Sequence, residues 1–111
     1  MEIKEEKSLK KFLTIIICNS GYADDCITVA RNHGAKGGTI LTGRGTATGE
    51  ELMFFHKFIE REKEILFIVL DEANKQAIID SIEAELGPQT DAHALCVTLD
   101  VDSVSGFANL K

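Results

Sequence analysis

Residues that could bind a metal are present in this sequence, but their spacing does not favour a metal site. The three histidines, His33, His56 and His93, lie far apart, and none has a second ligand three or four residues away, as a zinc-binding helix would. Asp100 and Asp102 could place two carboxylates on one face of a strand, yet the ligand-rich loop of a calcium site is missing. We expect His33 to cap the end of a helix, where an imidazolium is favoured, and the two aspartates to be solvated.

The candidate nucleophiles do not form a catalytic set. Cys26 falls near a predicted helix start, where a thiolate would be stabilised, but it belongs to the apolar face of that helix. Ser103 and Ser105 lie in a polar stretch without an obvious base. The cysteines are odd in number and include no CxxC pair, which predicts buried, reduced thiols in a cytosolic protein: Cys18, Cys26 and Cys96. No base, nucleophile and oxyanion hole come together, so we expect the protein not to be an enzyme.

The stretch Gly43-Arg44-Gly45 is a candidate binding site. It follows a strand pattern, but it lacks the lysine of a phosphate-binding P-loop and opens no clear Rossmann unit. Glycines let a ligand's phosphates approach the backbone, and an arginine can bind them through two hydrogen bonds. The same three residues could also simply make a turn, and the sequence leaves both interpretations open.

The charge of the chain argues against several classes of function. Its 111 residues include 12 Lys and Arg against 18 Asp and Glu, which gives a net charge of −6. An acidic chain is poorly suited to neutralising the phosphates of nucleic acids, and no basic amphipathic stretch favours an anionic membrane surface. The longest apolar run, residues 12–18, is too short to span a bilayer. We expect residues 1–11 to be a polar tail and residues 12–111 to form a single cytoplasmic domain.

One structural pattern occurs twice along the chain. Residues 12–18 are apolar and β-branched, as in a buried strand, and a turn follows them. A helix pattern then runs from Tyr22 to Gly34, and residues 36–42 suit a second strand. The second copy has a strand at residues 65–70, a helix that Asp71 opens and Gly87-Pro88 stops, and a strand at residues 94–100.

The order β-α-β, connector, β-α-β predicts a ferredoxin-like α+β domain. Right-handed crossovers place both helices on one face of a four-stranded antiparallel sheet. The other face would be bare and apolar, so we expect another subunit to cover it. The connector is ambiguous, because apolar residues in the range 50–63 recur at helical spacing, whereas the alternation of Phe55, Lys57, Ile59 and Arg61 equally fits a long strand.

With the doubled pattern and the glycine-flanked arginine in place, the chain resembles the PII (GlnB-like) signalling proteins. The stretch LTIIICNSGYADDCITVARNHGAKGGTILTGRG is similar to the first strand, first helix and second strand of that family. EILFIVLDEANKQAIIDSIEAELG is similar to its third strand and second helix, and ALCVTLDVDSVSGF to its fourth strand and exit. The resemblance covers residues 13–104, along which the order and spacing of the motifs agree.

The resemblance implies a homotrimer whose sheets face a central axis. It also implies three clefts between subunits that bind adenine nucleotides such as ATP, ADP or AMP. Carried over to this chain, the ligand contacts would come from the end of the second strand and from the loop after the second helix: Thr42, Gly43, Arg44, Gly45, Gly87, Gln89 and Thr90.

The resemblance further implies a regulated partner, often a membrane transporter or a metabolic enzyme, which is engaged by the loop after the second strand. Residues 46–55 are what remains of this T-loop, and the tyrosine that other members modify is absent. Phe54, Phe55 and Phe58 are expected to make core or trimer contacts.

The chain departs from the family where phosphates would bind. Pro88-Gln89-Thr90-Asp91 replaces a loop that carries glycine and lysine, and Ser103, Val104 and Ser105 stand where arginines normally follow the fourth strand. Three phosphate-binding charges are thus lost and Arg44 is one gained, so an acidic protein of this kind would bind a triphosphate poorly. Nucleotide binding as in PII, a less charged ligand, or no ligand all remain open.

The sequence therefore predicts a divergent, non-enzymatic, trimeric PII-like regulator that responds to a small ligand. One alternative is a metal-binding trimer like the CutA family, which shares this fold, although paired His or Cys ligands are lacking. Another is a hydrolase like acylphosphatase. That enzyme needs an arginine-bearing anion loop after its first strand, where this chain has Asn19-Ser20-Gly21-Tyr22.

Overall fold

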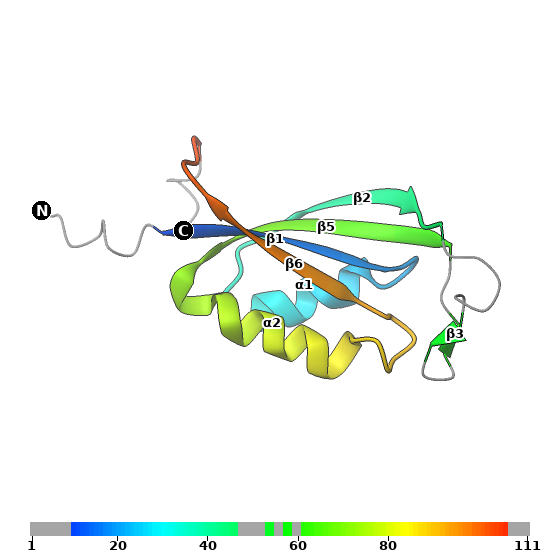
Figure 1. Ribbon diagram of the computed structural model, residues 1–111. Helices are drawn as coiled ribbons and strands as arrows, with labels where there is room; N and C mark the ends of the chain where they lie inside the picture. Colours follow the sequence, from blue (N-terminus) through cyan, green and yellow to red (C-terminus); the bar gives the residue numbers. More distant parts are fainter. Residues whose placement is uncertain (1–9, 47–52, 55–56, 59–60, 107–111) are drawn as a thin grey trace, which may run out of the picture.

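Strand β1 (Lys11–Asn19) lies inside the main sheet, between β5 (Glu62–Asp71) and β6 (Leu95–Val101). Strand β2 (Thr39–Arg44) pairs with the other side of β5, so the order is β2-β5-β1-β6 and every pair is antiparallel. The computed structural model describes residues 10–46, 53–54, 57–58 and 61–106. With helices α1 (Ala23–Asn32) and α2 (Glu72–Leu86), the main sheet has the predicted β-α-β-β-α-β order, and the ferredoxin-like fold is confirmed (Figure 1).

Both helices lie beneath one face of this sheet, and the hydrophobic core fills the space between the two layers (Figure 1). Along β1 every second side chain is buried, as the alternation of a half-covered strand requires. Each isoleucine or leucine that is fully removed from water there contributes about 1.5–3 kcal/mol. The largest fully buried apolar side chains come from β1, β5 and α2: Ile16, Leu66, Ile68, Leu70, Ile78 and Ile82.

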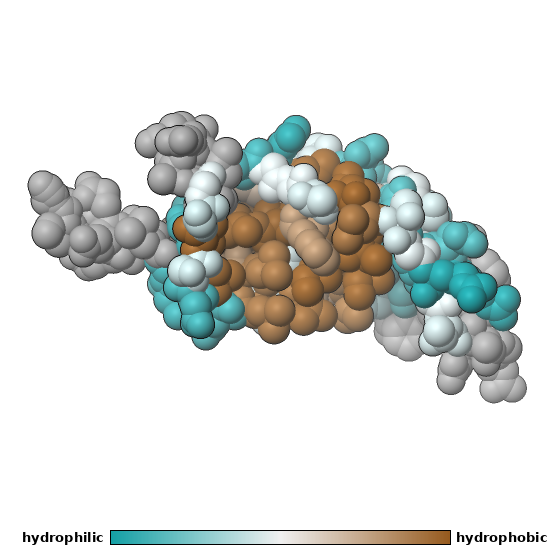
Figure 2. Space-filling model, turned by 90° about the horizontal axis from the view of Figure 1, so that it is seen from above, coloured by the Kyte–Doolittle hydropathy of each residue, from teal (hydrophilic) through white to brown (hydrophobic). Residues whose placement is uncertain are grey.

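The opposite face of the sheet, here called the open face, is covered by no other layer of the described chain. Strand pairing places its side chains in rows, for example Phe67, Ile15 and Val97 on β5, β1 and β6. Figure 2 looks onto this face and shows one continuous hydrophobic area. The expected bare, apolar face is therefore confirmed. Its residues are Leu13, Ile15, Ile17, Leu41, Ile65, Phe67, Val69, Leu95, Val97 and Leu99.

The second strand differs from its prediction, because it begins and ends later than residues 36–42. Its pairing with β5 starts at Thr39, opposite Phe67, and continues through Gly43 and Arg44. The interpretation of these last two residues as a turn was therefore wrong. The local sequence does not indicate that Gly43 and Arg44 belong to a strand, because glycine is uncommon inside strands. They are part of β2 because they pair with β5, which lies more than fifteen residues later in the chain.

The connector contains a short antiparallel hairpin of β3 (Met53–Phe54) and β4 (Lys57–Phe58). The helical interpretation is wrong for these four residues, and strand β5 already begins at Glu62. Figure 1 shows the hairpin beside the end of the sheet, outside its two layers. The rest of residues 50–60, His56 among them, and the side chains of Phe54, Phe55 and Phe58 lie outside the described part of the chain.

Helix α1 is held at both ends by side chains of other elements. At its start, the Glu64 carboxylate accepts a hydrogen bond of 2.9 Å from the Ala23 backbone N–H. At its end, His33 is the cap residue, as expected, and its ring lies 3.1 Å from the Val29 carbonyl and 3.1 Å from the Ser81 hydroxyl of α2. Among the described residues, no helix is both long enough and apolar enough to cross a membrane.

Candidate functional site

The sequence-predicted ligand residues lie at one end of the main sheet. Strand pairing places Gly43 of β2 beside Lys63 of β5, and Lys63 beside Asn19 of β1. The Lys63 ammonium donates a hydrogen bond of 2.8 Å to the Asn19 side-chain oxygen. The Asn19 amide in turn donates a hydrogen bond of 2.9 Å to the Asp91 carbonyl. One row of residues thus connects the edge strand β2 to the loop that follows α2.

The glycines in the β2 part of this row lie close to side chains of the neighbouring strand β5. A Cβ on Gly43 would lie 2.9 Å from Ile65 Cδ1, and one on Gly45 would lie 3.2 Å from Lys63 Cε. The pairing with β5 continues beyond β2, since the Gly45 N–H donates a hydrogen bond of 2.6 Å to the Arg61 carbonyl. A side chain at Gly43 or Gly45 would therefore require Ile65 or Lys63 to shift, whether or not a ligand also approaches the two glycines.

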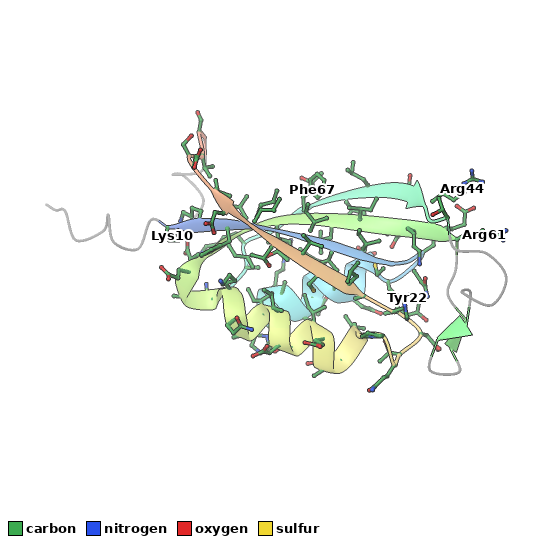
Figure 3. All side chains as sticks on the ribbon, viewed as in Figure 1. Lys10, Tyr22, Arg44, Arg61 and Phe67 are labelled. Carbon is green, nitrogen blue, oxygen red and sulfur yellow. The ribbon has the colours of Figure 1, made fainter. Side chains whose placement is uncertain are left out.

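Arg44 is the exposed cation of this segment, and it is the last residue of β2. Figure 3 shows Arg44 and Arg61 at the same end of the sheet, with Tyr22 below them and Lys10 at the opposite end. The residue that pairs with Arg44 on β5 is Glu62. This end of an acidic protein thus carries two guanidinium groups and the Lys63 ammonium, a combination that suits an anion.

The loop after α2 is folded upon itself. Both the backbone N–H and the hydroxyl of Thr90 donate hydrogen bonds to the Gly87 carbonyl, at 3.0 and 2.8 Å. The His93 ring nitrogen lies 3.1 Å from the Pro88 carbonyl, and His93 itself has a φ of 50°, in the left-handed region. Gly87 is needed for packing, because a Cβ there would lie 2.3 Å from the Glu83 carbonyl oxygen. In this arrangement Thr90 directs its donors into the loop, while Gln89 is exposed.

The two groups of sequence-predicted residues do not meet directly within one chain. Thr42, Gly43, Arg44 and Gly45 belong to β2, one edge of the sheet, or follow it directly. The loop with Gly87, Gln89 and Thr90 leads into β6, the other edge. Asn19 and Lys63 link the two groups, and sequence reasoning missed both residues. An asparagine in a turn gives no sign of long-range contacts, and Lys63 lies in a run of charges that usually marks a solvated surface.

The buried asparagine is the centre of this end of the molecule. Asn19 is 1% exposed, and its backbone N–H donates a further hydrogen bond of 2.8 Å to the Ala92 carbonyl. A buried amide group whose hydrogen bonds are satisfied fixes the neighbouring segments in one arrangement. The loop after α2 is therefore positioned by β1. A substitution at Asn19 should alter both its contact with Lys63 on β5 and its contacts with the loop that leads into β6.

The described residues do not include a group of three His, Cys, Asp or Glu side chains that could hold a metal ion. Within that part of the chain, Asp100 and Asp102 are exposed and His93 contacts its own loop. The start of α1 is capped by the Glu64 carboxylate. An anion would thus meet a negative group at that helix terminus, so the terminus does not add to the cationic end formed by the arginines.

Comparison with solved structures shows many similar chains, and three of them illustrate the likeness. A PII-like signalling protein of Thermus thermophilus has a TM-score of 0.64 and 20% identity, over 83% of this chain and 86% of that one. Arabidopsis thaliana PII bound to citrate has a TM-score of 0.65 and 18% identity, over 92% and 84%. B. subtilis GlnK in complex with ATP has a TM-score of 0.68 and 8% identity, over 92% and 93%. The chain has the PII-like fold.

The PII-like fold accounts for nearly the whole length of the chain, as the sequence resemblance implied. Comparison with protein-family models and with curated proteins finds no match. The identities to the solved structures are low, so the likeness is one of backbone arrangement. The PII-like proteins it matches include signalling proteins, and two of the structures hold an anion, citrate or ATP.

Proposed function

We propose that this chain is a non-catalytic PII-like regulator that assembles as a homotrimer and senses a small anionic ligand between its subunits. The single observation that carries the proposal is the open face. Ten apolar side chains stand on one face of the sheet, and several are well exposed, with Leu95 at 58% and Leu99 at 48%. Monomeric proteins rarely keep so large a continuous apolar area in contact with water.

A site between subunits follows from the position of the candidate ligand residues. Arg44 and the loop from Gly87 to Thr90 belong to opposite edges of one sheet. Copies that pack their open faces together bring the edge of one sheet near the other edge of its neighbour. The β2 end of one copy and the loop after α2 of another would then form one cleft, with Gly43 and Gly45 near the ligand.

The ligand that we propose is an anion, and an adenine nucleotide is the first candidate. Arg44, Arg61 and Lys63 supply positive charge at this end of the sheet. Thr90 donates both of its hydrogen bonds within its loop, and Glu62 and Glu64 contribute negative charge nearby. These features disfavour a triphosphate relative to AMP, ADP or a carboxylate such as citrate, because fewer donors are aimed at the phosphates.

The partner that we propose is a protein, such as a transporter or a metabolic enzyme, which contacts the segment between β2 and β5. This segment begins directly after Arg44, and its hairpin of β3 and β4 stands beside the end of the sheet (Figure 1). A ligand that contacts Arg44 would therefore act on the last residue before this segment. The T-loop of this chain would transmit the state of the cleft to the partner.

The oligomeric state and ligand binding can be tested together. Light scattering should report a trimer, and thermal unfolding should be measured with AMP, ADP, ATP and citrate, with and without magnesium. A ligand at a hundred times its dissociation constant adds about 2.7 kcal/mol to the folded state. For a domain of this size the melting temperature then rises by several degrees.

Arg44→Ala should abolish the ligand-induced rise, whereas the matched variant Arg31→Ala, on the exposed last turn of α1, should keep it. A monomer in solution would overturn the proposed assembly. A trimer whose melting temperature responds to none of these anions would overturn the proposed ligand class.

A further inference from the structure

The Lys63 ammonium lies between the glycine-bearing end of β2 and the buried Asn19. Strand pairing places Lys63 opposite Gly43 on one side and opposite Asn19 on the other. A Cβ on Gly45 would lie 3.2 Å from Lys63 Cε, the carbon that carries the ammonium, and the ammonium itself lies 2.8 Å from the Asn19 side-chain oxygen. An anion that approaches the backbone of Gly45 would therefore come close to this ammonium.

The present partner of this ammonium, the amide oxygen of Asn19, carries no net charge. A carboxylate or phosphate oxygen attracts an ammonium more strongly, because full charges of opposite sign then meet. Lys63 is only half-buried, and its four-carbon stem is flexible. Neighbouring strands are about 4.8 Å apart, so the ammonium can turn from the β1 side to the β2 side without movement of the backbone.

The Asn19 amide is held from both of its ends. Its oxygen accepts the hydrogen bond from Lys63, and its nitrogen donates a hydrogen bond of 2.9 Å to the Asp91 carbonyl. The side chain is 1% exposed, so the loss of Lys63 removes a donor from a buried oxygen and costs free energy. The two bonds together fix the plane of the amide, and the contact with Asp91 becomes weaker when Lys63 leaves.

We infer that Asn19 competes with the anion for the Lys63 ammonium, so that an occupied anion site weakens the hold of β1 on the loop after α2. The inference rests on the anion site proposed above at the end of β2. Asn19 is a positioning residue in this scheme, because it acts on the ligand through Lys63. The effect is reciprocal, since a loop held firmly by Asn19 lowers the affinity for the anion by the same factor.

Two substitutions at Asn19 separate competition from a loss of structure. Asn19→Ala and Asn19→Asp both remove the amide group that donates to the Asp91 carbonyl, so a purely structural effect changes the affinity in the same direction in both variants. Competition predicts opposite directions. Asn19→Ala should bind citrate and ADP about tenfold more tightly, because Lys63 is released. Asn19→Asp should bind them more weakly than the wild type, because its carboxylate pairs with Lys63. Isothermal titration calorimetry measures these affinities.

A double variant tests whether Lys63 is the shared group. In the Lys63→Gln background, Asn19→Ala should no longer change the affinity, because the group for which Asn19 and the anion compete is gone. Ser20→Ala, in the exposed neighbouring turn, is the matched control and should bind like the wild type. An increase in affinity that persists in the Lys63→Gln background would overturn the inference.

Hydrogen exchange on the wild-type protein gives a test that needs no Asn19 variant to fold. The Asn19 N–H donates to the Ala92 carbonyl, whereas the Glu72 N–H donates to the Lys10 carbonyl at the opposite end of the sheet (Figure 3). Saturating citrate or ADP should speed exchange at Asn19 relative to Glu72. An equal or lower relative rate at Asn19 would overturn the inference.

The calorimetric results distinguish failure of this inference from failure of the proposed function. If the wild type binds citrate or ADP and both Asn19 variants bind with unchanged or weaker affinity, competition is overturned and the anion site stands. If neither the wild type nor any variant binds either anion, the proposed ligand class is overturned, and the competition with it.

Discussion

The Lys63 ammonium lies 2.8 Å from the side-chain oxygen of Asn19, and this contact joins the third and first strands of the predicted pattern at one end of the sheet. Asn19 also holds the loop after α2 through the Asp91 and Ala92 carbonyls. A residue that would be read as part of an ordinary turn is therefore the point where both edges of the candidate site are connected.

Asn19→Ala should destabilise the protein by about 1–3 kcal/mol, because it removes a buried side chain that hydrogen-bonds to Lys63 and to the Asp91 carbonyl. Urea unfolding of the variant and the wild type would measure the difference. Ser20→Ala, at the exposed neighbouring position, is the control and should have little effect. Equal stability of Asn19→Ala and wild type would show that the hydrogen bonds at this end add nothing to the fold.

Val97→Lys should convert the proposed trimer to monomers, because it places a charge in the centre of the open face. Val97 is 39% exposed in the single chain. Ile40→Lys is a matched control, since Ile40 is 42% exposed but pairs with the buried Leu66 and so belongs to the helix-covered side of the sheet. Light scattering decides between the two faces. Loss of assembly in the Ile40 variant alone would place the interface on the edge strand.

Gly38→Ala should cost about 1–3 kcal/mol, because the added methyl group overpacks the sheet. Its Cβ would lie 2.8 Å from the Phe67 carbonyl oxygen and 2.9 Å from Leu66 Cδ1. Gly37→Ala is the control, since the nearest atom to its Cβ is 4.0 Å away on Arg31. Thermal unfolding should separate these two neighbours clearly, and similar melting temperatures would contradict the described start of β2.

Alkaline pH should weaken the protein through Cys96. Burial raises the pKa of this thiol from 9.0 to about 11, so the folded chain holds the proton more tightly than the unfolded chain. The corresponding contribution to stability is complete below pH 9 and is lost as the pH rises toward 11. Urea unfolding at about pH 8 and about pH 10.5 should show a smaller loss for Cys96→Ala than for wild type. An identical pH dependence in both proteins would argue against this cause.

Much of the fold could be predicted from the sequence because its strands and helices carry local signals. The β-branched run around Ile16 indicates a buried strand, and Gly87-Pro88 marks the end of α2. The end of β2 could not be predicted in this way. Gly43 and Arg44 look like a turn, and only their pairing with Lys63 and Glu62 makes them part of a strand.

The candidate site was predictable only in part, for the same reason. Arg44 is recognisable as a candidate anion ligand from its type and its glycine neighbours. The contacts of Asn19, and the closure of the loop by Thr90, depend on the folded arrangement of the chain. No local pattern in the chain encodes such contacts, so they become visible only when the strands have been placed side by side.

The open face also affects how a newly synthesised chain behaves before it has bound another protein. A single chain exposes this apolar surface to chaperones and to unrelated proteins. If assembly covers the face, encounter rates between copies rise steeply with the amount of protein made, while a lone chain stays at risk of aggregation. The amount of assembled protein would then rise more steeply than the amount of chain synthesised, because chains at low concentration would be removed before they assemble.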